Sequence, residues 1–454
     1  MNKKVKLQSF FIASLLLISA CSNNDNINNL DIAQSEILQN NNKVNVPEDK
    51  NILPQIKSNT IEQTEWGTKV KALPIIKETK KASVLSYMGF DNDKGDFGGT
   101  YDRDELRKII NFHELSGSSS VMNMILQTDG VEKADLKRYM IIKDEDANKM
   151  VSPYTSFKYE RNSADYRVLG AFVKWGFSTY PSQIKMLDID SHGGAFVGIT
   201  KDRTSKTTIN LPNLSKALKS SGFKLDILNF DACLMGAMEV VYELKDNADI
   251  IIGSQDSTLT TGMLYTKALP SIIAGSKTAE EISRKIVLAS DIKGNKDFIY
   301  DDFSKQVNQQ GKTPNVFTIA SYRTSKLENL AKELDKLAKM IINKLPQQKQ
   351  AIKVAFDGTH APRLAQEEVE GQRDLYEILS RIEFTNYDQE IKAQVKETRE
   401  ALNKVIVIAR INQHEVAQGM AINISPNSVS SDLYKATAFA KNTSWDEMVL
   451  AVNK

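Results

Sequence analysis

Two short stretches of the sequence carry residues that can do chemistry together. His192 follows the apolar run Ile184–Ser191 and has two glycines after it, and Cys233 closely follows the apolar run Leu225–Phe230. A cysteine thiolate is a nucleophile, and a nearby imidazole can take its proton or return it. Glycines beside the histidine let a substrate backbone approach and leave an N–H free to donate. The pattern is compatible with a Cys/His dyad for nucleophilic catalysis, although by residue type alone a core cysteine and a hydrogen-bonded structural histidine are the commoner cases.

The segments that must position these residues alternate between short apolar runs and amphipathic stretches, which is typical of βα units around a largely parallel sheet. Groups at the carboxyl ends of such strands gather along one edge, so we expect the loops of His192 and Cys233 to meet there. The predicted strands are Ser83–Gly89, Val121–Thr128, Tyr139–Lys143, Ile184–Ser191, Leu225–Phe230, Asp249–Ser254 and Asn315–Tyr322. The predicted helices are Asp102–Leu115, Ala164–Phe177, Leu214–Ser220, Leu234–Lys245 and Ala279–Ser290.

The helix predicted to begin at Leu234 bears directly on the cysteine. The partial positive charge of a helix N-terminus would favour the thiolate form of Cys233. Two plainer interpretations stay open, because a lone cysteine at such a junction is often a core residue and Asp231 could simply cap the helix. The remaining histidines follow no clear parallel strand and are not expected to be catalytic: His113, His360 and His414.

The second half of the chain has mainly helical periodicity. Two late apolar runs, Val405–Ile411 and Met420–Ile424, could return to the sheet. We therefore expect an α/β core over residues 81–325 and a mainly helical C-terminal region over residues 326–454 that packs on it. The predicted helices of this region are Leu327–Leu345, Asp374–Ile382 and Tyr387–Ala401.

The N-terminal 20 residues have the features of an export signal: three lysines, an apolar stretch and small residues before Cys21. The ending Leu-Ile-Ser-Ala-Cys resembles the bacterial lipobox, which implies cleavage before Cys21 and attachment of a lipid there. Ser22 mildly favours the outer membrane or cell surface of the envelope. A plain secretory signal with a free Cys21 is the alternative. The asparagine-rich residues after it predict a flexible tether over residues 21–80.

Composition excludes several classes of protein. The chain has 454 residues with 59 Lys+Arg against 57 Asp+Glu, so nothing favours nucleic-acid binding. Two cysteines rule out a disulfide-rich scaffold and a Cys₄ zinc site. No glycine-rich nucleotide motif is present, so no cofactor is expected. Asp91–Asp96 has alternating carboxylates that would suit calcium, but its glycine is misplaced and no closing Glu follows, so a solvated turn is favoured.

Several motifs together give the chain a family resemblance. It resembles the clostripain-like family of cysteine peptidases, whose fold is caspase-like, over about residues 82–430. The matching strings are Tyr87-Met-Gly-Phe-Asp-Asn92, Asp190-Ser-His-Gly-Gly194, Phe230-Asp-Ala-Cys-Leu-Met-Gly236, Ile251-Ile-Gly-Ser-Gln-Asp256, Gly262-Met-Leu-Tyr265, Asp374-Leu-Tyr376 and Gly419-Met-Ala-Ile-Asn-Ile-Ser425.

The resemblance implies a role for each site residue. Cys233 would attack the scissile carbonyl and His192 would act as acid and base, with the N–H groups of Gly193 and Cys233 as oxyanion donors. Asp231 would line the primary specificity pocket, with Asp256 as a weaker second candidate. A carboxylate there pairs with a cationic side chain, so cleavage after Arg or Lys is expected.

The resemblance also implies a zymogen activated by cleavage between the two motifs. Lys201, Arg203 and Lys206 lie there in a polar segment, so self-cleavage after one of them is expected. Met263 and the pair Ala195-Phe196 depart from the family pattern, which affects subsites and leaves the dyad intact. Some family members use calcium, but no strong motif supports it here. Two alternatives stay open: a catalytically silent binding lipoprotein, and a Cys/His amide hydrolase or acyl transferase that does not act on proteins.

Overall fold

The computed structural model describes residues 62–91, 103–130, 132, 135–146, 149–256, 258, 268–290, 317–360, 369–412 and 417–454. The export signal, Cys21 and the tether as far as residue 61 lie outside the described residues. The described residues all belong to one unit of the chain, residues 46–454.

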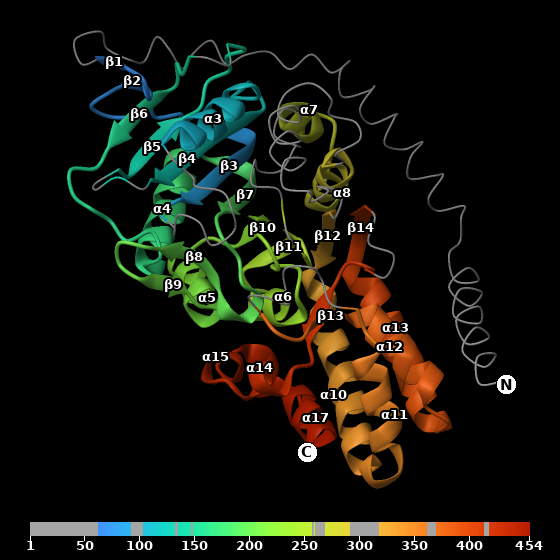
Figure 1. Ribbon diagram of the computed structural model, residues 1–454. Helices are drawn as coiled ribbons and strands as arrows, with labels where there is room; N and C mark the ends of the chain where they lie inside the picture. The colour runs from blue at the N-terminus through green and yellow to red at the C-terminus, as the bar shows by residue number, and fades with distance from the viewer. Residues whose placement is uncertain are drawn as a thin grey trace, which may run out of the picture. The chain divides into compact units, whose positions relative to one another are not determined.

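The centre of the fold is a run of five parallel strands (Figure 1). Their sequences are rich in apolar residues at successive positions because both faces of the sheet are covered by helices. Lys80–Gly89, for example, is buried along nearly its whole length. In spatial order these strands are β4 (Met122–Asp129), β3 (Lys80–Gly89), β7 (Ser182–Asp190), β10 (Leu225–Asp231) and β11 (Ala248–Gly253).

Shorter strands extend both sides of this parallel centre to an 11-stranded sheet. Beyond β4 the added strands are β5 (Lys137–Met140), β6 (Pro153–Ser156), β2 (Gly67–Lys69) and β1 (Glu62–Thr64). Beyond β11 the added strands are β12 (Phe317–Arg323) and β14 (Ile406–Asn412), both antiparallel to their neighbours.

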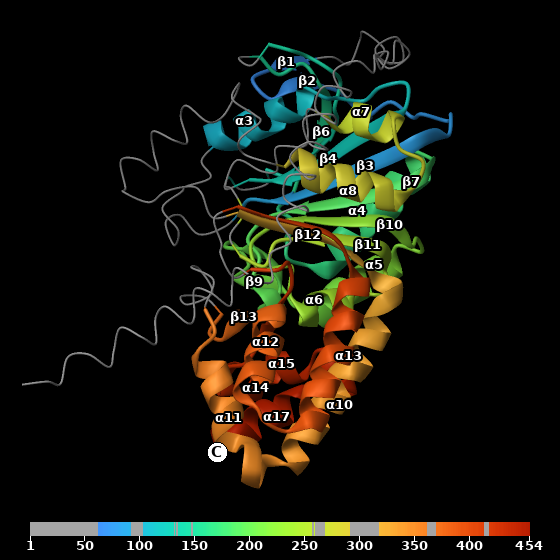
Figure 2. The same ribbon diagram turned by 90° about the vertical axis from the view of Figure 1, so that its right-hand side faces the viewer.

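Helices cover both faces of the sheet (Figure 2). One face carries α4 (Tyr166–Thr179), α5 (Leu211–Ser220) and α6 (Met238–Glu243), and the other carries α3 (Arg103–Glu114), α7 (Leu269–Ala274) and α8 (Ala279–Ala289). Good N-caps begin several of them: the Asp165 carboxylate accepts from the N–H of Arg167 at the start of α4, and Asn210 accepts from Asn213 at the start of α5.

The chain reverses its direction of growth across the sheet at β3. The crossover through α3 places β4 on one side of β3, and the later crossover through α4 places β7 on the other side. In open α/β sheets such a reversal leaves a crevice at the carboxyl ends of the strands, which is where ligands bind. The His192 and Cys233 loops follow β7 and β10, next to this point.

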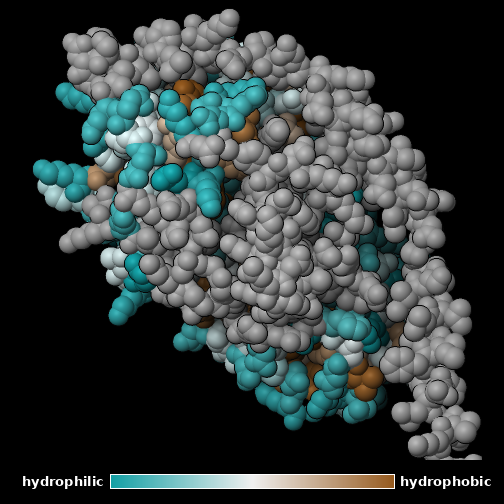
Figure 3. Space-filling model, turned by 45° about the horizontal axis from the view of Figure 1, so that its top comes forward, coloured by the Kyte–Doolittle hydropathy of each residue, from teal (hydrophilic) through white to brown (hydrophobic). Residues whose placement is uncertain are grey.

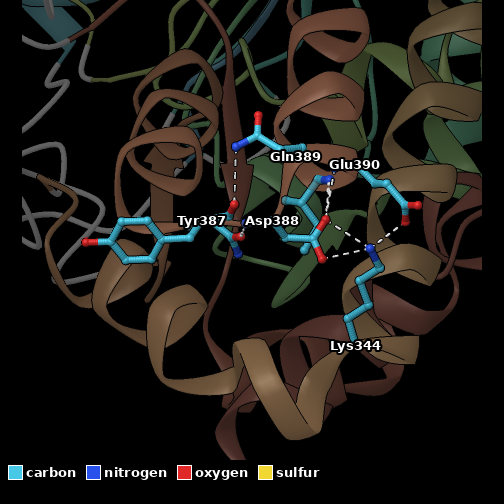
Figure 4. Close-up of polar contacts among 7 residues, drawn as sticks. Lys344, Tyr387, Asp388, Gln389 and Glu390 are labelled. Atoms are coloured by element: carbon cyan, nitrogen blue, oxygen red, sulfur yellow. Dashed lines mark hydrogen bonds and ion pairs between the residues drawn. The ribbon is translucent and has the colours of Figure 1, made fainter.

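The C-terminal region packs its helices against the core and also adds β14 to the main sheet. A separate two-stranded sheet pairs β13 (Gln372–Asp374) with β15 (Ala421–Asn423). Figure 4 shows one polar junction among the helices: Lys344 Nζ binds Asp388 at 2.7 Å and Glu390 at 2.5 Å. The helices are α10 (Leu327–Asn343), α11 (Leu345–Asp357), α12 (Leu375–Thr385), α13 (Gln389–Val405), α14 (Pro426–Ser430), α15 (Asp432–Lys435), α16 (Ala438–Asn442) and α17 (Trp445–Asn453).

The α/β fold expected from the sequence is confirmed, with three local corrections. The helix predicted from Leu234 begins only at Met238, because residues 234–237 turn against β11 first. The run Met420–Ile424 pairs with β13 and does not rejoin the main sheet. The strand predicted at Tyr139–Lys143 lies at Lys137–Met140.

Among the described helices, none is both long and apolar enough to cross a bilayer. The described surface drawn in Figure 3 is mostly hydrophilic, with apolar residues in small separate patches. Large apolar side chains that are exposed in the C-terminal region include Phe384 in α12, and Tyr387 in the segment between α12 and α13.

Candidate active site

The histidine loop begins where β7 ends and is held on both sides. Ser191 Oγ donates to the carbonyl of Gly89 at the end of β3, over 2.7 Å. The carbonyl of His192 itself accepts from the N–H of Thr200 at 3.0 Å. Ala195 and Thr200 both have positive φ, so the chain curls tightly back after the histidine. The His192 side chain is half-buried, which leaves part of it accessible.

The cysteine loop follows β10 and turns at once. Leu234 has a φ of 63°, a conformation that a residue with a branched side chain rarely adopts. Its N–H donates to the carbonyl of Asp256 at 3.0 Å, and the N–H of Gly236 donates to the carbonyl of Ser254 at 2.6 Å. Leu234 is buried while Cys233 is half-buried, so the tight turn presents the thiol and anchors its neighbour. Strain of this kind is held in place at functional sites.

The two loops meet at the same edge of the sheet. Asp190 and Asp231 are register partners on β7 and β10, and His192 and Cys233 each follow two residues later. Gly193 then lies against the cysteine loop so closely that a Cβ on it would be 2.2 Å from the carbonyl oxygen of Cys233. Only glycine fits that contact. The structure therefore brings together the two loops that carry His192 and Cys233.

The N–H of Gly193 belongs to the part of the histidine loop that packs against the cysteine loop. Within the described part of the chain, this N–H donates to no backbone carbonyl. The backbone hydrogen bonds of this loop are made by the flanking residues instead. The N–H of Gly194 donates to the Gly198 carbonyl at 2.9 Å, and the N–H of Thr200 donates to the His192 carbonyl. A backbone N–H that is fixed in place and available can stabilise a developing negative charge.

The surroundings of the sulfur correct one expectation. Cys233 does not lie at a helix N-terminus, because α6 begins five residues later, so its dipole cannot act on the thiol. For the same reason Asp231 is not the cap of that helix, whose N-cap is Ala237. The sulfur instead accepts from the N–H of Thr258 at 3.3 Å, and Thr258 Oγ1 lies 3.7 Å away. Donors to sulfur favour the thiolate.

Buried carboxylates line the strands just below the dyad. Asp188, Asp190 and Asp231 are all less than a tenth exposed. Burial, and then repulsion from Asp231 and Asp188, raises the pKa of Asp190 well above its usual range. Asp188 is satisfied by Asn229 Nδ2 at 2.6 Å and Ser86 Oγ at 3.1 Å. Neighbouring carboxylates that cannot all ionise together attract a cation.

Asp256, the second carboxylate considered for a specificity pocket, is fully buried. Its backbone carbonyl accepts from Leu234, and its N–H lies 3.2 Å from both Ser254 Oγ and Thr318 Oγ1. These contacts hold the turn that follows Cys233. Of the two candidates, Asp231 at the end of β10 is therefore the better placed to meet a substrate.

The segment with the three basic residues forms a hairpin attached to the histidine loop. β8 (Ile199–Asp202) pairs with β9 (Thr207–Ile209). Arg203 is tied to buried Asp91: its N–H donates to the Asp91 carbonyl at 2.6 Å, and its Nε lies 3.5 Å from the carboxylate. Lys201 is half-buried in β8, whereas Lys206 is exposed and has a φ of 54°. Lys206 is thus the most accessible of the three.

Asp91 corrects the expected solvated turn. It is buried, and its carboxylate accepts from Thr204 N–H at 3.1 Å besides facing Arg203. Residues 92–96 of that motif lie outside the described residues. Across the residues that the structure does describe, no group of three or more His, Cys, Asp or Glu side chains is arranged to hold a metal ion.

Residues far along the chain support the cysteine loop, and sequence spacing did not assign them this task. Ala421 N–H donates to the carbonyl of Gly236 at 2.9 Å, so the small sheet of β13 and β15 touches this loop. Gln255 joins the two regions: its Oε1 accepts from Gly419 N–H at 2.6 Å and its Nε2 donates to Asp374 at 3.1 Å. In the sequence, the strings around Asp374 and Gly419 indicate a family resemblance but no contact with the cysteine loop.

The other described histidines have structural surroundings. His113 is buried in α3 with Nδ1 2.8 Å from the Ile109 carbonyl, and burial lowers its pKa to about 4. His360 Nδ1 lies 2.8 Å from Glu377. His414 lies outside the described residues.

Comparison with known proteins agrees with this fold. The model of the clostripain family matches residues 86–450. Clostripain of Hathewaya histolytica is 29% identical over 146 residues, which cover 28% of this chain and 28% of that protein. That alignment therefore spans little more than a quarter of the curated relative.

Solved structures resemble the chain over most of its length. A secreted C11 cysteine protease from Bacteroides thetaiotaomicron, bound to an irreversible peptide inhibitor, matches with a TM-score of 0.55 at 18% identity, covering 82% of this chain and 99% of that one. An inactive zymogen of a C11 protease from Parabacteroides distasonis matches with a TM-score of 0.58 at 19% identity, covering 81% and 99%. At such identities the match shows the fold.

The family match and the fold together define a cysteine peptidase of caspase-like architecture. The chain belongs to the clostripain family. The resemblance stated from the sequence motifs is thereby confirmed, as is the class of cysteine peptidase that it implied.

Proposed function

We propose that this chain is an endopeptidase that hydrolyses the bond after arginine or lysine, with Cys233 as nucleophile and His192 as acid and base. One observation carries the proposal: Gly193 packs on the carbonyl of Cys233, which brings the histidine and cysteine loops together at one edge of the sheet. Both side chains are half-buried and so can be reached by a substrate. A binding protein would have no need of this arrangement.

The chemistry follows from these positions. The thiolate of Cys233 attacks the scissile carbonyl carbon, and the carbonyl oxygen becomes an oxyanion held by the N–H groups of Gly193 and Cys233. The intermediate collapses, the C–N bond breaks, and His192 gives its proton to the leaving amine. Water then attacks the thioester, with His192 taking its proton, and the thiol is restored when the acid product leaves.

Specificity for a basic side chain rests on Asp231. It ends β10 two residues before Cys233, next to Asp190, whose pKa is raised well above its usual range by burial and by the neighbouring carboxylates. Arginine can meet a carboxylate with two parallel hydrogen bonds, so it should be preferred over lysine.

Activation by self-cleavage in the β8–β9 hairpin completes the proposal. The hairpin starts at the strand whose N–H binds the His192 carbonyl, so a cut there would free the histidine loop to adjust. Its exposure makes Lys206 the favoured site, ahead of Lys201 and Arg203.

We further propose that Cys21 is lipidated after removal of residues 1–20, which would hold the enzyme at the outer membrane or cell surface. The sequence before Cys21 supports this, since small residues precede it and an apolar stretch precedes them. Mass spectrometry of the mature N-terminus tests the point: a diacylated Cys21 is expected. An unmodified mature N-terminus beginning at Cys21 would contradict it.

The central test is a panel of fluorogenic peptides with Arg, Lys, Leu or Asp before the scissile bond. The Arg peptide should be cleaved fastest and Lys next, and Cys233→Ala should abolish both activities while keeping the thermal midpoint. Failure to cleave either basic peptide, even after nicking residues 201–206 with trypsin, would sink the proposal. Cleavage of small amides alone, with no peptide turned over, would favour an amide hydrolase.

A further inference from the structure

A pocket separate from the Cys/His edge lies beside α4, with a volume of about 460 Å³. It is built between the β4–β6 part of the sheet and the first turns of α4. Because the sheet order runs β5, β4, β3, β7, three strand spacings separate β5 from the histidine strand. Six residues form most of its wall: Gln127, Leu136, Arg138, Phe157, Val168 and Ala171.

Arg138 is the central feature of this pocket. Its guanidinium lies over three aromatic rings, 4.3 Å from the centroid of Trp175, 5.0 Å from Phe157 and 5.6 Å from Phe172. Such stacking holds the planar cation in one orientation. Burial lowers the pKa of Arg138 to about 10, so it remains charged at neutral pH.

No acid balances this cation within the described part of the chain. None of the carboxylates there lies within ion-pair distance of Arg138, whose Nε donates instead to the neutral Oε1 of Gln127 at 2.7 Å. Gln127 is almost fully buried, and its Nε2 has no hydrogen-bond partner among the described residues. A partly buried charge is normally paired, so this guanidinium lacks the partner that burial calls for.

The rest of the pocket adds positive charge. Arg161 is exposed at the rim, and no described acid forms an ion pair with it. Asp165, which also lines the pocket, is already bound to Arg167 at 2.6 Å and caps α4 through the N–H of Arg167. After that pairing, Arg138 and Arg161 remain as the cations of the pocket that no described acid pairs with.

We propose that this pocket binds a small carboxylic acid with an apolar body, its carboxylate held by the guanidinium of Arg138. A carboxylate can take two parallel N–H donors from arginine. The apolar wall formed by Leu136, Phe157 and Val168 would enclose the body of the molecule, and the volume falls in the range of small-molecule sites. This ligand site goes beyond peptide hydrolysis and does not depend on it.

The fluorescence of Trp175 can report binding at this pocket, because its ring is in contact with the guanidinium of Arg138. We would titrate the purified full chain with octanoate and 3-phenylpropionate, and follow tryptophan fluorescence and the thermal midpoint. The matched probes are octanol and 3-phenylpropanol, which keep the body without the charge, and acetate and inorganic phosphate, which keep the charge without the body. Saturable binding of an acid, about tenfold or more tighter than its alcohol, is expected.

Two pocket variants and one control make the test sharp. Arg138→Gln should weaken binding by about tenfold or more, and Ala171→Trp should block the pocket from the exposed side of α4 while leaving Arg138 in place. Arg284→Gln removes an exposed arginine on α8, outside the pocket, and should bind like the native chain. Equal affinity for acid and alcohol, no binding of either acid, or unchanged binding in a folded Ala171→Trp variant would overturn the proposal. So would phosphate or acetate binding as tightly as the larger acids.

Discussion

Gly193 and Cys233 share one space: a side chain at position 193 would occupy the place of the Cys233 carbonyl oxygen, with a Cβ 2.2 Å away. Met235 Cγ and Ala232 Cβ lie at 2.9 Å and 3.1 Å from the same point, so the glycine is enclosed on several sides. This contact sets the separation of the histidine and cysteine loops.

Gly193→Ala should therefore reduce activity strongly, because one loop must move by a large part of an ångström. We expect a fall in kcat/KM of about 100-fold for a basic peptide, since misplacement of about 1 Å costs that much. Gly194→Ala is the matched control: its Cβ would meet Val197 at an ordinary 3.4 Å, and near-native activity is expected. Equal kinetics for the two variants would show that the contact does not set the geometry.

Asp231→Asn keeps the shape of the side chain and removes its charge. We expect kcat/KM for the Arg peptide to fall. The fall should correspond to a loss of about 2–5 kcal/mol in transition-state stabilisation, which is the cost of breaking a buried charge pair. Asp226→Asn, near the other end of β10, should leave turnover nearly unchanged because that carboxylate only accepts from the N–H of Lys185. Unaltered cleavage by Asp231→Asn would remove this residue from the specificity pocket.

Self-processing should depend on Lys206 more than on its neighbours. Lys206→Ala should abolish most of the cleavage within residues 201–206, whereas Arg203→Ala should leave it, since Arg203 is held by Asp91. Cys233→Ala should remain uncut in purified form. N-terminal sequencing of the fragments checks the site. Cleavage of Cys233→Ala at the native rate would instead mean that another peptidase makes the cut.

Asp374 gives a test of the support behind the cysteine loop. Its carboxylate accepts from Gln255 Nε2, Gln418 N–H and Glu377 N–H, so Asp374→Ala leaves three donors without their acceptor. We expect a loss of about 3 kcal/mol or more in the free energy of unfolding, and weaker catalysis as well.

The control for this variant is Asp388→Ala. Asp388 also caps a helix, α13, and binds Lys344 far from the cysteine loop (Figure 4). It should lose some stability and keep its kcat/KM. If both variants keep full activity when folded, the contact through Gln255 does not support catalysis.

Stability should depend on pH through Asp129. Burial first, and then Glu160, Asp202 and Asp91, raises its pKa to about 8 from 3.8. The folded chain thus keeps a proton that the unfolded chain loses, so this contribution is fully present below about pH 4. As the pH rises from about 4 to about 8, this contribution to the free energy of unfolding is lost at up to about 1.4 kcal/mol per pH unit.

Asp129→Asn should remove that slope. Urea unfolding at pH 5, 6.5 and 8 measures it as the difference between native and variant. His113, with a pKa of about 4, gives the opposite slope between pH 4 and 6.5. It is present in both proteins and cancels in the comparison. Parallel stability curves for the two proteins would contradict the assignment.

The sequence by itself determined the α/β architecture and the two chemical residues. Strongly apolar runs such as Leu225–Phe230 form strands in any context that buries both faces, and parallel strands bring their carboxyl ends to one edge. Because His192 and Cys233 each follow such a strand, the topology of a parallel sheet predicts that their loops lie at the same edge. The helix boundary after Cys233 was not predictable, because the N–H groups of Leu234 and Gly236 donate to the carbonyls of Asp256 and Ser254, just after β11, and local periodicity does not contain these partners.

Only the tertiary structure decided the supports of the site. Thr258 reaches the sulfur from a separate loop, Gln255 joins the cysteine loop to Asp374 more than 100 residues away, and Arg138 meets the rings of a helix later in the chain. These contacts join residues that are far apart in sequence, and neither residue type nor spacing specifies them. They exist because the folded core brings those backbones together, and burial then requires each polar group to find a partner.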